Sequence, residues 1–370
     1  MNKELIIIIG AGAIGRGYLP WIFPDGKYDL VFVDHDKKLV DTMNTQGGYH
    51  SYMSKEEGLE EKYFSVKEAV LITDFDYTNY TNINTIYVAV GPRNVPAIAS
   101  KVKGVKAPIV LLENDDKTVP LLQGLIGQDN VYFAIPDVIT SNTASEANLK
   151  NDKLAVHTEN GVFFVDERAK AAIGDINYCS ELELKNQWTA KLFLHNTPHC
   201  IAAYLGSLRG TIYVHDPMHH EKSRKVIDGA MNEMLKTLKL KWDIPHQFLD
   251  WYAEKELSRF ANENLCDPVS RVAREPFRKL SLDGRLVGAA LMCLEVGFIP
   301  YNILLGIVAA LLYQNKQDPD NHIIFVMENI NPKIILSYLI KLRDGEVLES
   351  LLEKNFKTLV SKLDQIVEEK

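Results

Sequence analysis

The glycine-rich segment GAGAIGRG, which begins at Gly10, constrains the fold of this chain more than any other part of the sequence. It directly follows the apolar run ELIIIIG and opens a stretch with a helical pattern. Gly10, Gly12 and Gly15 have the GxGxxG spacing, which permits a tight turn, close approach of a pyrophosphate and close packing of helix on strand. We therefore expect a dinucleotide to lie against these glycines and against Ala13 and Ile14 in the first helical turn.

Residues that end later strands complete the predicted cofactor site. Asp34 ends the second apolar run, where a carboxylate accepts hydrogen bonds from the adenosine ribose. It would repel a 2′-phosphate, so NAD is favoured over NADP, although Asp36 could share or take this role. Gly91 in AVGPRN would lie against the dinucleotide, and Asn114 in LLEND would reach the nicotinamide side. A plain turn at Gly91 and a loop cap at Asn114 are the alternative interpretations.

The first half of the chain alternates short, β-branched apolar runs with helical patterns. Such runs are typical of strands buried on both faces of a parallel sheet, and their alternation with helices predicts a doubly wound α/β fold of the Rossmann type. The candidate strands are residues 4–10, 28–34, 69–75, 84–90, 108–114 and 130–136. Two more candidates, 153–159 and 162–167, follow a polar loop at 141–152.

Helical patterns dominate the second half of the chain. We expect residues 1–184 to form an NAD-binding domain and residues 185–370 to form a mostly α-helical domain for substrate binding and catalysis. The apolar stretch 286–313 is interrupted by Glu295 and Pro300, and it predicts two buried helices rather than a membrane span.

The overall composition limits the classes of partner. With 41 basic and 49 acidic residues the net charge is −8, which argues against nucleic acid or an anionic membrane as a partner. The four cysteines form no CxxC pair, so neither a disulfide framework nor a structural zinc site is indicated. The N-terminal apolar run is too short for a signal-peptide core. We expect a cytoplasmic protein, a monomer or a homodimer, that acts on a small molecule.

The segment AKLFLHNTPHC, residues 190–200, combines an apolar run with groups that carry chemistry. On an α-helix, Asn196 and His199 lie about 140° and 80° around the axis from Lys191, so the three share one broad face. A dehydrogenase that works without a metal needs a base for the hydroxyl proton and donors for the developing oxyanion. Lysine serves as a base where its surroundings lower its pKa, and Pro198 should bend or interrupt the helix beside His199.

Two other interpretations of this segment compete with the catalytic one. The polar groups could be ordinary residues of a helix between domains. His195 and His199 are also four residues apart, which is the separation of a helical zinc pair. The glutamate of an HExxH motif is absent, since Asn196 stands in its place, and we expect a site without metal.

The segment KLFLHNTPHCIAAYLG (191–206) resembles the K-x4-N-x2-H element of the polyol-specific long-chain dehydrogenases, the mannitol dehydrogenase family. The resemblance continues in RVAREPFRKLSLDGRL (271–286) and LEVGFIPYNILLGIVAALL (294–312), and GAGAIGRG and AVGP also fit it. It spans most of the chain and is strongest toward the mannitol-1-phosphate 5-dehydrogenases. It implies a zinc-independent NAD enzyme in which Lys191 is the general base and Asn196 and His199 stabilise the oxyanion.

The chain departs from the family pattern at two places. A V-D-R-I element usually follows the sixth strand, whereas the matching residues here are 138–141, with Asp137 out of register. The phosphate-specific enzymes often carry a glutamate just before the lysine, where this chain has Thr189 and Ala190. Both departures bear on the substrate more than on the type of reaction.

A basic segment lies between residues 271 and 285 of this otherwise acidic chain. Arginine binds phosphate or carboxylate through two parallel hydrogen bonds, so we expect Arg274, Arg278 and Lys279 to bind an anionic end of the substrate. Arg271 and Arg285 belong to the same cluster. The alternative is a solvated face whose charges pair with Glu275 and Asp283.

The combined prediction is an NAD-dependent oxidoreductase that interconverts a sugar-alcohol phosphate and a ketose phosphate, with mannitol 1-phosphate and fructose 6-phosphate as the preferred pair. A related enzyme for a free polyol or a hexuronate, of the mannitol 2-dehydrogenase or uronate reductase type, is the alternative within the family. A sensor that binds NAD without catalysis is the alternative from another class, and the joint presence of Lys191, Asn196 and His199 argues against it.

Overall fold

The computed structural model describes residues 3–55, 58–170, 174–318, 320 and 346–368. The chain divides into two compact units, Met1–Gln187 and Trp188–Lys370, and each is described by itself.

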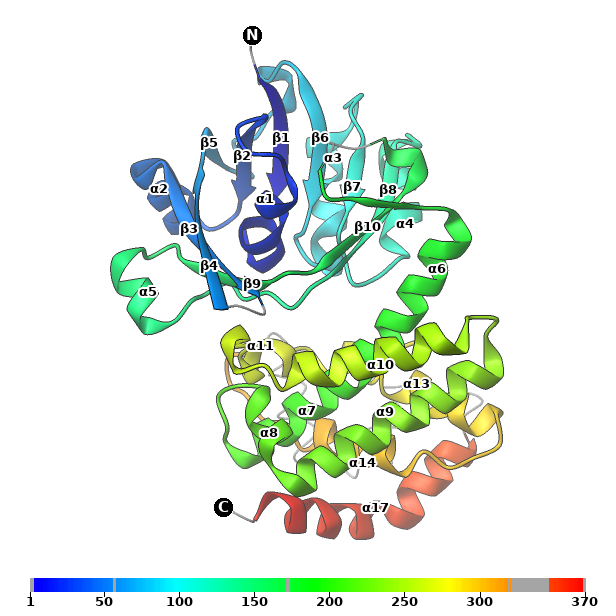
Figure 1. Ribbon diagram of the computed structural model, residues 1–370. Helices are drawn as coiled ribbons and strands as arrows, with labels where there is room; N and C mark the ends of the chain where they lie inside the picture. The colour runs from blue at the N-terminus through cyan, green and yellow to red at the C-terminus, as the bar shows by residue number, and fades with distance from the viewer. Residues whose placement is uncertain (1–2, 56–57, 171–173, 319, 321–345, 369–370) are drawn as a thin grey trace. The chain divides into compact units, whose positions relative to one another are not determined.

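Unit 1 is built on a sheet of eight strands in the order β11-β10-β8-β7-β6-β1-β2-β5 (Figure 1). All neighbouring strands are parallel except β8 and β10, which are antiparallel. The strands are β1 (Glu4–Ile9), β2 (Tyr28–Asp34), β5 (Glu68–Leu71), β6 (Ile83–Val88), β7 (Ile109–Leu111), β8 (Val131–Asp137), β10 (Val162–Asp166) and β11 (Asn177–Cys179). Because β1 pairs with β2 on one side and β6 on the other, the strand order reverses at β1, and the loop after β1 opens at this switch point. The predicted α/β class is confirmed.

The apolar run of β1 supplies both faces of this sheet, as side chains alternate along a strand. Ile6 and Ile8 pack into one buried cluster, with residues of α1 (Leu19–Ile22) and α2 (Lys37–Gln46). Ile7 and Ile9 pack into a second cluster, with residues of α3 (Ala99–Val102) and α4 (Thr118–Ile126). Burial on both faces explains why this strand contains four isoleucines in a row.

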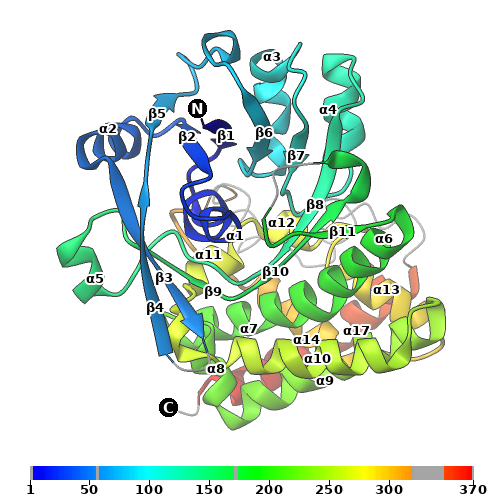
Figure 2. The same ribbon diagram turned by 45° about the horizontal axis from the view of Figure 1, so that its top comes forward.

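A second sheet of three strands, in the order β4-β3-β9, was not expected from the sequence. Its strands β3 (Gly48–Lys55) and β4 (Gly58–Ser65) pair antiparallel and run side by side in Figure 2. Its third strand, β9 (Val156–Glu159), pairs with β3, and α5 (Glu146–Asn151) lies in the region predicted as a polar loop. Most residues of β4 are exposed, so its sequence lacks the apolar run that marks a strand buried on both faces.

Unit 2 is helical in its described residues, and its central helix α7 (Asn196–Arg209) is buried along nearly its whole length. Helices α9 (Glu221–Lys241), α11 (Val269–Ala273) and α14 (Tyr301–Leu311) pack around α7. The remaining helices are α6 (Glu181–Ala190), in which the division between the units falls, α8 (His215–His219), α10 (His246–Phe260), α12 (Pro276–Lys279), α13 (Val287–Glu295) and α17 (Glu346–Val367). The two helices predicted within 286–313 are α13 and α14. None of the helices in the described ranges has the length and hydropathy needed to cross a membrane.

Candidate active site

The glycine loop of unit 1 needs two of its glycines for steric reasons and leaves open space at the third. Gly10 has φ +100°, and a Cβ there would lie 2.3 Å from the carbonyl oxygen of Ala89. A Cβ at Gly15 would lie 2.0 Å from the carbonyl oxygen of Gly10. At Gly12, by contrast, no atom of the described chain lies within 4 Å of a Cβ. The loop therefore packs tightly against Ala89 at Gly10 and against its own backbone at Gly15, and it leaves space for a ligand at Gly12.

The loop continues into a π-helical turn, η1 (Ala13–Tyr18), whose carbonyl groups bind side chains of other segments. Thr140 Oγ1 donates to the carbonyl of Ala13 at 3.1 Å, Tyr49 Oη to that of Arg16 at 2.8 Å, and Ser51 Oγ to that of Gly17 at 3.1 Å. The buried Arg16 side chain in turn donates to the carbonyl of Ala11 at 2.8 Å and also to that of Leu154. The region 138–141, which departs from the family pattern, thus supports the glycine loop through Thr140.

Asp34 lies next to the glycine loop, whereas the side chain of Asp36 caps a helix. Oδ2 of Asp34 accepts from the backbone N–H of Ala11 at 2.7 Å, and its Oδ1 accepts from that of Asp36 at 3.0 Å. Oδ1 of Asp36 caps α2 by accepting from the N–H groups of Lys38 and Leu39 at 2.8 and 3.2 Å. Of the two candidates for the ribose, Asp34 is therefore the one beside the loop.

Gly91 and Asn114 follow β6 and β7, and the carboxyl ends of parallel strands meet at one edge of a sheet. Gly91 has φ +88°, and the nearest atom to a Cβ there would be Asn94 Nδ2 at 3.9 Å. Oε1 of the buried Glu113 accepts from the N–H of Val90 at 2.8 Å and so ties the two strand ends together. Asn114 is exposed. Both predicted residues thus lie at the edge of the sheet that carries the glycine loop.

In unit 2, Lys191, Asn196 and His199 are all buried, with exposed fractions of 5%, 5% and 6%. Lys191 begins a π-helical turn, η5 (Lys191–His195), and the N–H of Asn196 donates to the carbonyl of Lys191 across this wider turn. The predicted angles of 140° and 80° assumed an α-helix throughout and are therefore wrong for Lys191.

The interruption of the helix predicted for Pro198 lies in the turn before the proline. Helix α7 continues regularly through Pro198 to Arg209, and the irregularity lies in the turn before it. The physical reason is that Pro198 has no N–H group to donate to the carbonyl of Leu194, four positions earlier, and its ring clashes with that carbonyl in a regular helix. The preceding turn is wider, while the first turn of a helix tolerates a residue without an N–H group.

The His199 ring lies in a polar and aromatic environment. Its Nε2 is 3.2 Å from Oδ2 of Asp267, and its face stacks on Phe260 with ring centroids 4.8 Å apart and an interplanar angle of 2°. The angle of approach does not give Nε2 a well-aligned hydrogen bond within the described residues, although the separation is that of an ion pair. The two groups are within the range of a polar contact, which becomes an ion pair only when the ring is protonated.

His195 is held by a second buried carboxylate, Glu256 on α10, which contacts its Nδ1 and also pairs with Arg259. The His195 and His199 rings meet edge to face, with centroids 4.9 Å apart. Each of these histidines thus presents one ring nitrogen to a carboxylate, at Glu256 or Asp267. The environment is that of two histidine–carboxylate pairs.

The predicted anion-binding residues differ in whether their side chains already bind other groups of the protein. Helices α11 and α12 are separated by Arg274 and by Glu275, which has φ +56°, so Arg274 and Arg278 do not lie on one helix. Nε and Nη2 of Arg278 donate to Glu275 at 3.3 and 3.2 Å. The buried ammonium of Lys279 donates to the carbonyls of Val272 and Arg274.

Arg274 and Arg285 have no such partners. The exposed Arg274 guanidinium makes no hydrogen bond or ion pair with the described residues. The Arg285 side chain is only 9% exposed, and within the described chain it too has neither. Its backbone is fixed on α7, since its carbonyl accepts from Thr197 Oγ1 at 2.6 Å. Burial, followed by the neighbouring Arg278, lowers the pKa of Arg285 to about 10.

Sequence reasoning missed Asp267, Glu256 and Phe260. They lie 61 to 68 residues after their histidine partners, at separations that no helical or strand period relates. No local signal marked them, since a carboxylate in a loop or on a helix is most often exposed.

Comparison with known proteins gives a consistent picture. Residues 183–365 match the mannitol dehydrogenase C-terminal domain. Over 339 residues the chain is 31% identical to mannitol-1-phosphate 5-dehydrogenase of Caldanaerobacter subterraneus subsp. tengcongensis, covering 84% of this chain and 86% of that protein. It is 31% identical to the enzyme of the same name from Thermoanaerobacter pseudethanolicus, again with 84% and 86% coverage.

Solved structures with a similar fold include Pseudomonas fluorescens mannitol 2-dehydrogenase in a ternary complex with NAD and D-mannitol. The TM-score is 0.77 at 14% identity, covering 100% of this chain and 95% of that one. A D-sorbitol dehydrogenase in substrate-free form has a TM-score of 0.63 at 16% identity, covering 99% and 92%. At these identities the likeness concerns the fold.

Proposed function

Since this chain belongs to the mannitol dehydrogenase family, we propose that it is an NAD-dependent oxidoreductase that interconverts a sugar-alcohol phosphate and a ketose phosphate. Mannitol 1-phosphate and fructose 6-phosphate are the preferred pair, as the names of the two relatives at 31% identity suggest. Unit 1 would be the NAD-binding domain, and unit 2 would supply the catalytic and substrate-binding residues. The observation that carries this proposal is the burial of a lysine in η5 and of an asparagine and a histidine at the start of α7.

The residues of unit 1 fit NAD. The open space at Gly12 leaves room for a pyrophosphate against the backbone, and Ala13 and Ile14 begin the turn whose N–H groups would face it. The Asp34 carboxylate beside the N–H of Ala11 suits a ribose with free hydroxyls and repels a 2′-phosphate. When bound, NAD accepts the hydride that the alcohol carbon gives up on oxidation.

The three residues of unit 2 supply the proton chemistry. Lys191 in its neutral form would take the proton of the hydroxyl group as hydride leaves, and as the ammonium it would return a proton in the reverse direction. Nδ2 of Asn196 is buried and has no hydrogen-bond partner in the described chain. A buried donor without a partner is costly, so the reacting oxygen of the substrate is a fitting acceptor for it. His199 would be the second residue that forms a hydrogen bond with a substrate oxygen.

The unpartnered arginines support an anionic substrate end. A guanidinium as buried as that of Arg285 is costly unless an anion compensates its charge, and the described chain provides none in contact. Arg274, exposed and without a partner, could provide a second fork, whereas Arg278 would have to share its charge with Glu275. Lys279 remains a predicted ligand, although its ammonium already binds two carbonyls. Such forks bind phosphate through two parallel hydrogen bonds, as they do carboxylate.

A substrate panel tests the proposal directly. Polyols, polyol phosphates and hexonates are each supplied with NAD or NADP, and the formation of reduced nicotinamide is followed by absorbance. Turnover should be highest for a polyol phosphate with NAD. Faster turnover of a free polyol or a hexonate would assign the chain to another branch of the family. Binding of NAD without turnover of any compound would support the alternative of a sensor that binds NAD without catalysis.

Arginine variants test the anion site. Arg285→Gln should raise KM for the phosphorylated substrate by about 10- to 100-fold, because it removes hydrogen bonds to a charged group. Arg274→Gln should raise it less, since water competes at an exposed site. Arg224→Gln is the control, as this arginine of α9 pairs with Asp228 in half-exposed surroundings. Equal losses on phosphorylated and free polyols would show that Arg285 is structural.

A further inference from the structure

The contact between His199 and Asp267 belongs to a longer chain of charged groups. Oδ1 and Oδ2 of Asp267 accept from Nε and Nη2 of Arg271, each at 2.7 Å, while Oδ2 also lies 3.2 Å from Nε2 of His199. Burial alone would raise the pKa of Asp267, but Arg271 and His199 outweigh it and hold that pKa below its ordinary value. Asp267 therefore faces the ring as a carboxylate at neutral pH.

The backbone fixes Asp267 independently of its side-chain partners. Its carbonyl accepts from the N–H of Val214 at 3.0 Å, and the N–H of Val269 donates to the carbonyl of Ile212 at 2.8 Å. Tyr213 and Pro268 form an antiparallel bridge between the same two segments. The backbone that carries the Asp267 carboxylate is thus hydrogen-bonded to the segment 212–214 and is not a free loop.

The His199 ring is also restrained on its other sides. Phe260 on α10 covers one face, and the edge-to-face contact with His195 leaves little room for the ring to turn. The charged groups that act on the ring are Asp267, Arg271 on α11 and Glu256 on α10. Burial lowers the pKa of His199, although Asp267 acts in the opposite direction, so the ring is neutral near pH 7 and carries one proton.

We propose that Asp267 is the positioning residue for His199: its carboxylate keeps the single ring proton on Nε2 and leaves Nδ1 free to accept a hydrogen bond from a substrate hydroxyl. The placement of the proton follows from charge, since a bare nitrogen facing a carboxylate at 3.2 Å would set two lone pairs against each other. This inference rests on the proposed function only in naming a substrate hydroxyl as the group that donates to Nδ1. It divides the predicted oxyanion pair, because Asn196 then donates to the reacting oxygen while His199 accepts.

The variant Asp267→Asn should reverse the arrangement. An asparagine keeps only one oxygen, and the two N–H donors of Arg271 would claim it. The amide NH2 would then face Nε2 of His199 and move the ring proton to Nδ1, as in the serine-protease triad when its aspartate is replaced by asparagine. A ring protonated at Nδ1 cannot accept from the substrate, so kcat should fall by at least about 10-fold, with KM for NAD unchanged.

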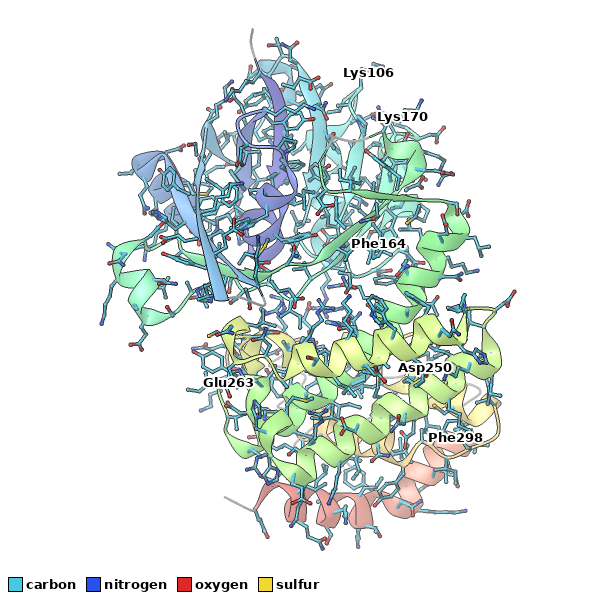
Figure 3. The ribbon with its side chains drawn as sticks, in the orientation of Figure 1. Lys106, Phe164, Lys170, Asp250, Glu263 and Phe298 are labelled. Atoms are coloured by element: carbon cyan, nitrogen blue, oxygen red, sulfur yellow. The ribbon has the colours of Figure 1, made fainter. Side chains whose placement is uncertain are left out.

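Two measurements test this together. In protein labelled with ¹⁵N-histidine, long-range ¹H–¹⁵N correlation spectra distinguish the two tautomers, and His199→Gln identifies the resonances of this ring. The wild-type spectrum should show the proton on Nε2, and Asp267→Asn should move it to Nδ1. Glu263→Gln is the matched control: Glu263, labelled in Figure 3, faces His219 at 3.4 Å with both side chains exposed. It should change neither the His199 resonances nor kcat.

The proposal is overturned if the wild-type ring carries its proton on Nδ1, a result that does not depend on whether any variant folds. It is also overturned if Asp267→Asn folds and leaves both the tautomer and kcat unchanged. Should no compound of the substrate panel turn over, the proposed function fails, while the spectra still decide the tautomer. The two failures are therefore distinguishable.

Discussion

The two segments that carry the predicted chemistry share a local geometry and use it differently. In unit 1 the π-helical turn η1 precedes Pro20, and in unit 2 the turn η5 precedes Pro198. A proline within a helix leaves the carbonyl four residues earlier without its usual donor. In unit 1 that carbonyl belongs to Arg16, and the Tyr49 hydroxyl donates to it instead. A wide turn before a proline thus occurs at both sites.

The difference lies in which groups face the ligand. At the glycine loop the backbone is the proposed functional surface, since the open space is at Gly12 and the side chain of Thr140 donates to a carbonyl of the turn. At α7 the proposed functional groups are side chains; among them His199 contacts the distant carboxylate of Asp267, and the neighbouring His195 contacts that of Glu256. A backbone site is therefore readable from residue spacing, whereas a side-chain site requires the tertiary contacts. Substitutions at the two sites should accordingly fail in different ways.

The largest effect is expected at Lys191. Lys191→Ala removes the base, and turnover should fall by at least about 10³-fold in both directions. NAD binding, measured by the quenching of protein fluorescence, should stay near normal because the lysine belongs to unit 2. In the unmodified protein, oxidation requires the neutral amine and should rise with pH, while reduction requires the ammonium and should fall. A folded Lys191→Ala protein with near-normal turnover would require a different base.

Two alanine substitutions in the glycine loop should separate folding from binding. Gly15→Ala forces a Cβ against the carbonyl of Gly10, so unit 1 should lose about 1–3 kcal/mol or more of stability, seen as a lower thermal midpoint. Gly12→Ala meets no atom of the described chain within 4 Å and should leave the midpoint unchanged. It should nevertheless weaken NAD binding, since the added methyl group occupies the space proposed for the pyrophosphate. If Gly12→Ala bound NAD normally, the loop would not be the cofactor site.

A smaller effect is expected at Asp34. Asp34→Ala should weaken NAD binding by about 10-fold and reduce the preference over NADP, because the bonds to the ribose are charge-assisted. Asp36→Ser is the control, as serine preserves the cap of α2 that Asp36 provides. It should leave the ratio of kcat/KM for the two cofactors unchanged. A change of that ratio in Asp36→Ser alone would transfer the ribose role to Asp36.

The smallest expected effect is that of a chelator. Lysine-based proton transfer needs no zinc, so prolonged dialysis against a chelator should leave turnover unchanged. Loss of activity that added zinc restores would favour the interpretation of His195 and His199 as metal ligands. In that case the carboxylates of Glu256 and Asp267 would orient the ligands, a common arrangement around zinc.

The sequence predicted the main sheet well, but in the second sheet only strand β9 lies in a run predicted as a strand. The runs at β1 and β2 are apolar throughout because both faces of these strands are buried, and such runs are recognisable without a structure. Strand β4 has one buried residue, Phe64, and its polar neighbours gave no period to detect. The run predicted at 153–159 is a strand only from Val156, and it pairs with β3 rather than joining the main sheet.

By itself the sequence determined the glycine loop, the carboxylate after β2 and the presence of Lys191, Asn196 and His199 in one short segment, because these features depend on spacing within a few turns or one strand–loop–helix unit. Only the tertiary structure decided what surrounds them. Asp267 reaches His199 because the segments 212–214 and 267–269 pair. Arg285 is held against α7 because its carbonyl accepts a hydrogen bond from Oγ1 of Thr197. Contacts between residues so far apart in the chain depend on how whole elements pack, and no local period encodes them.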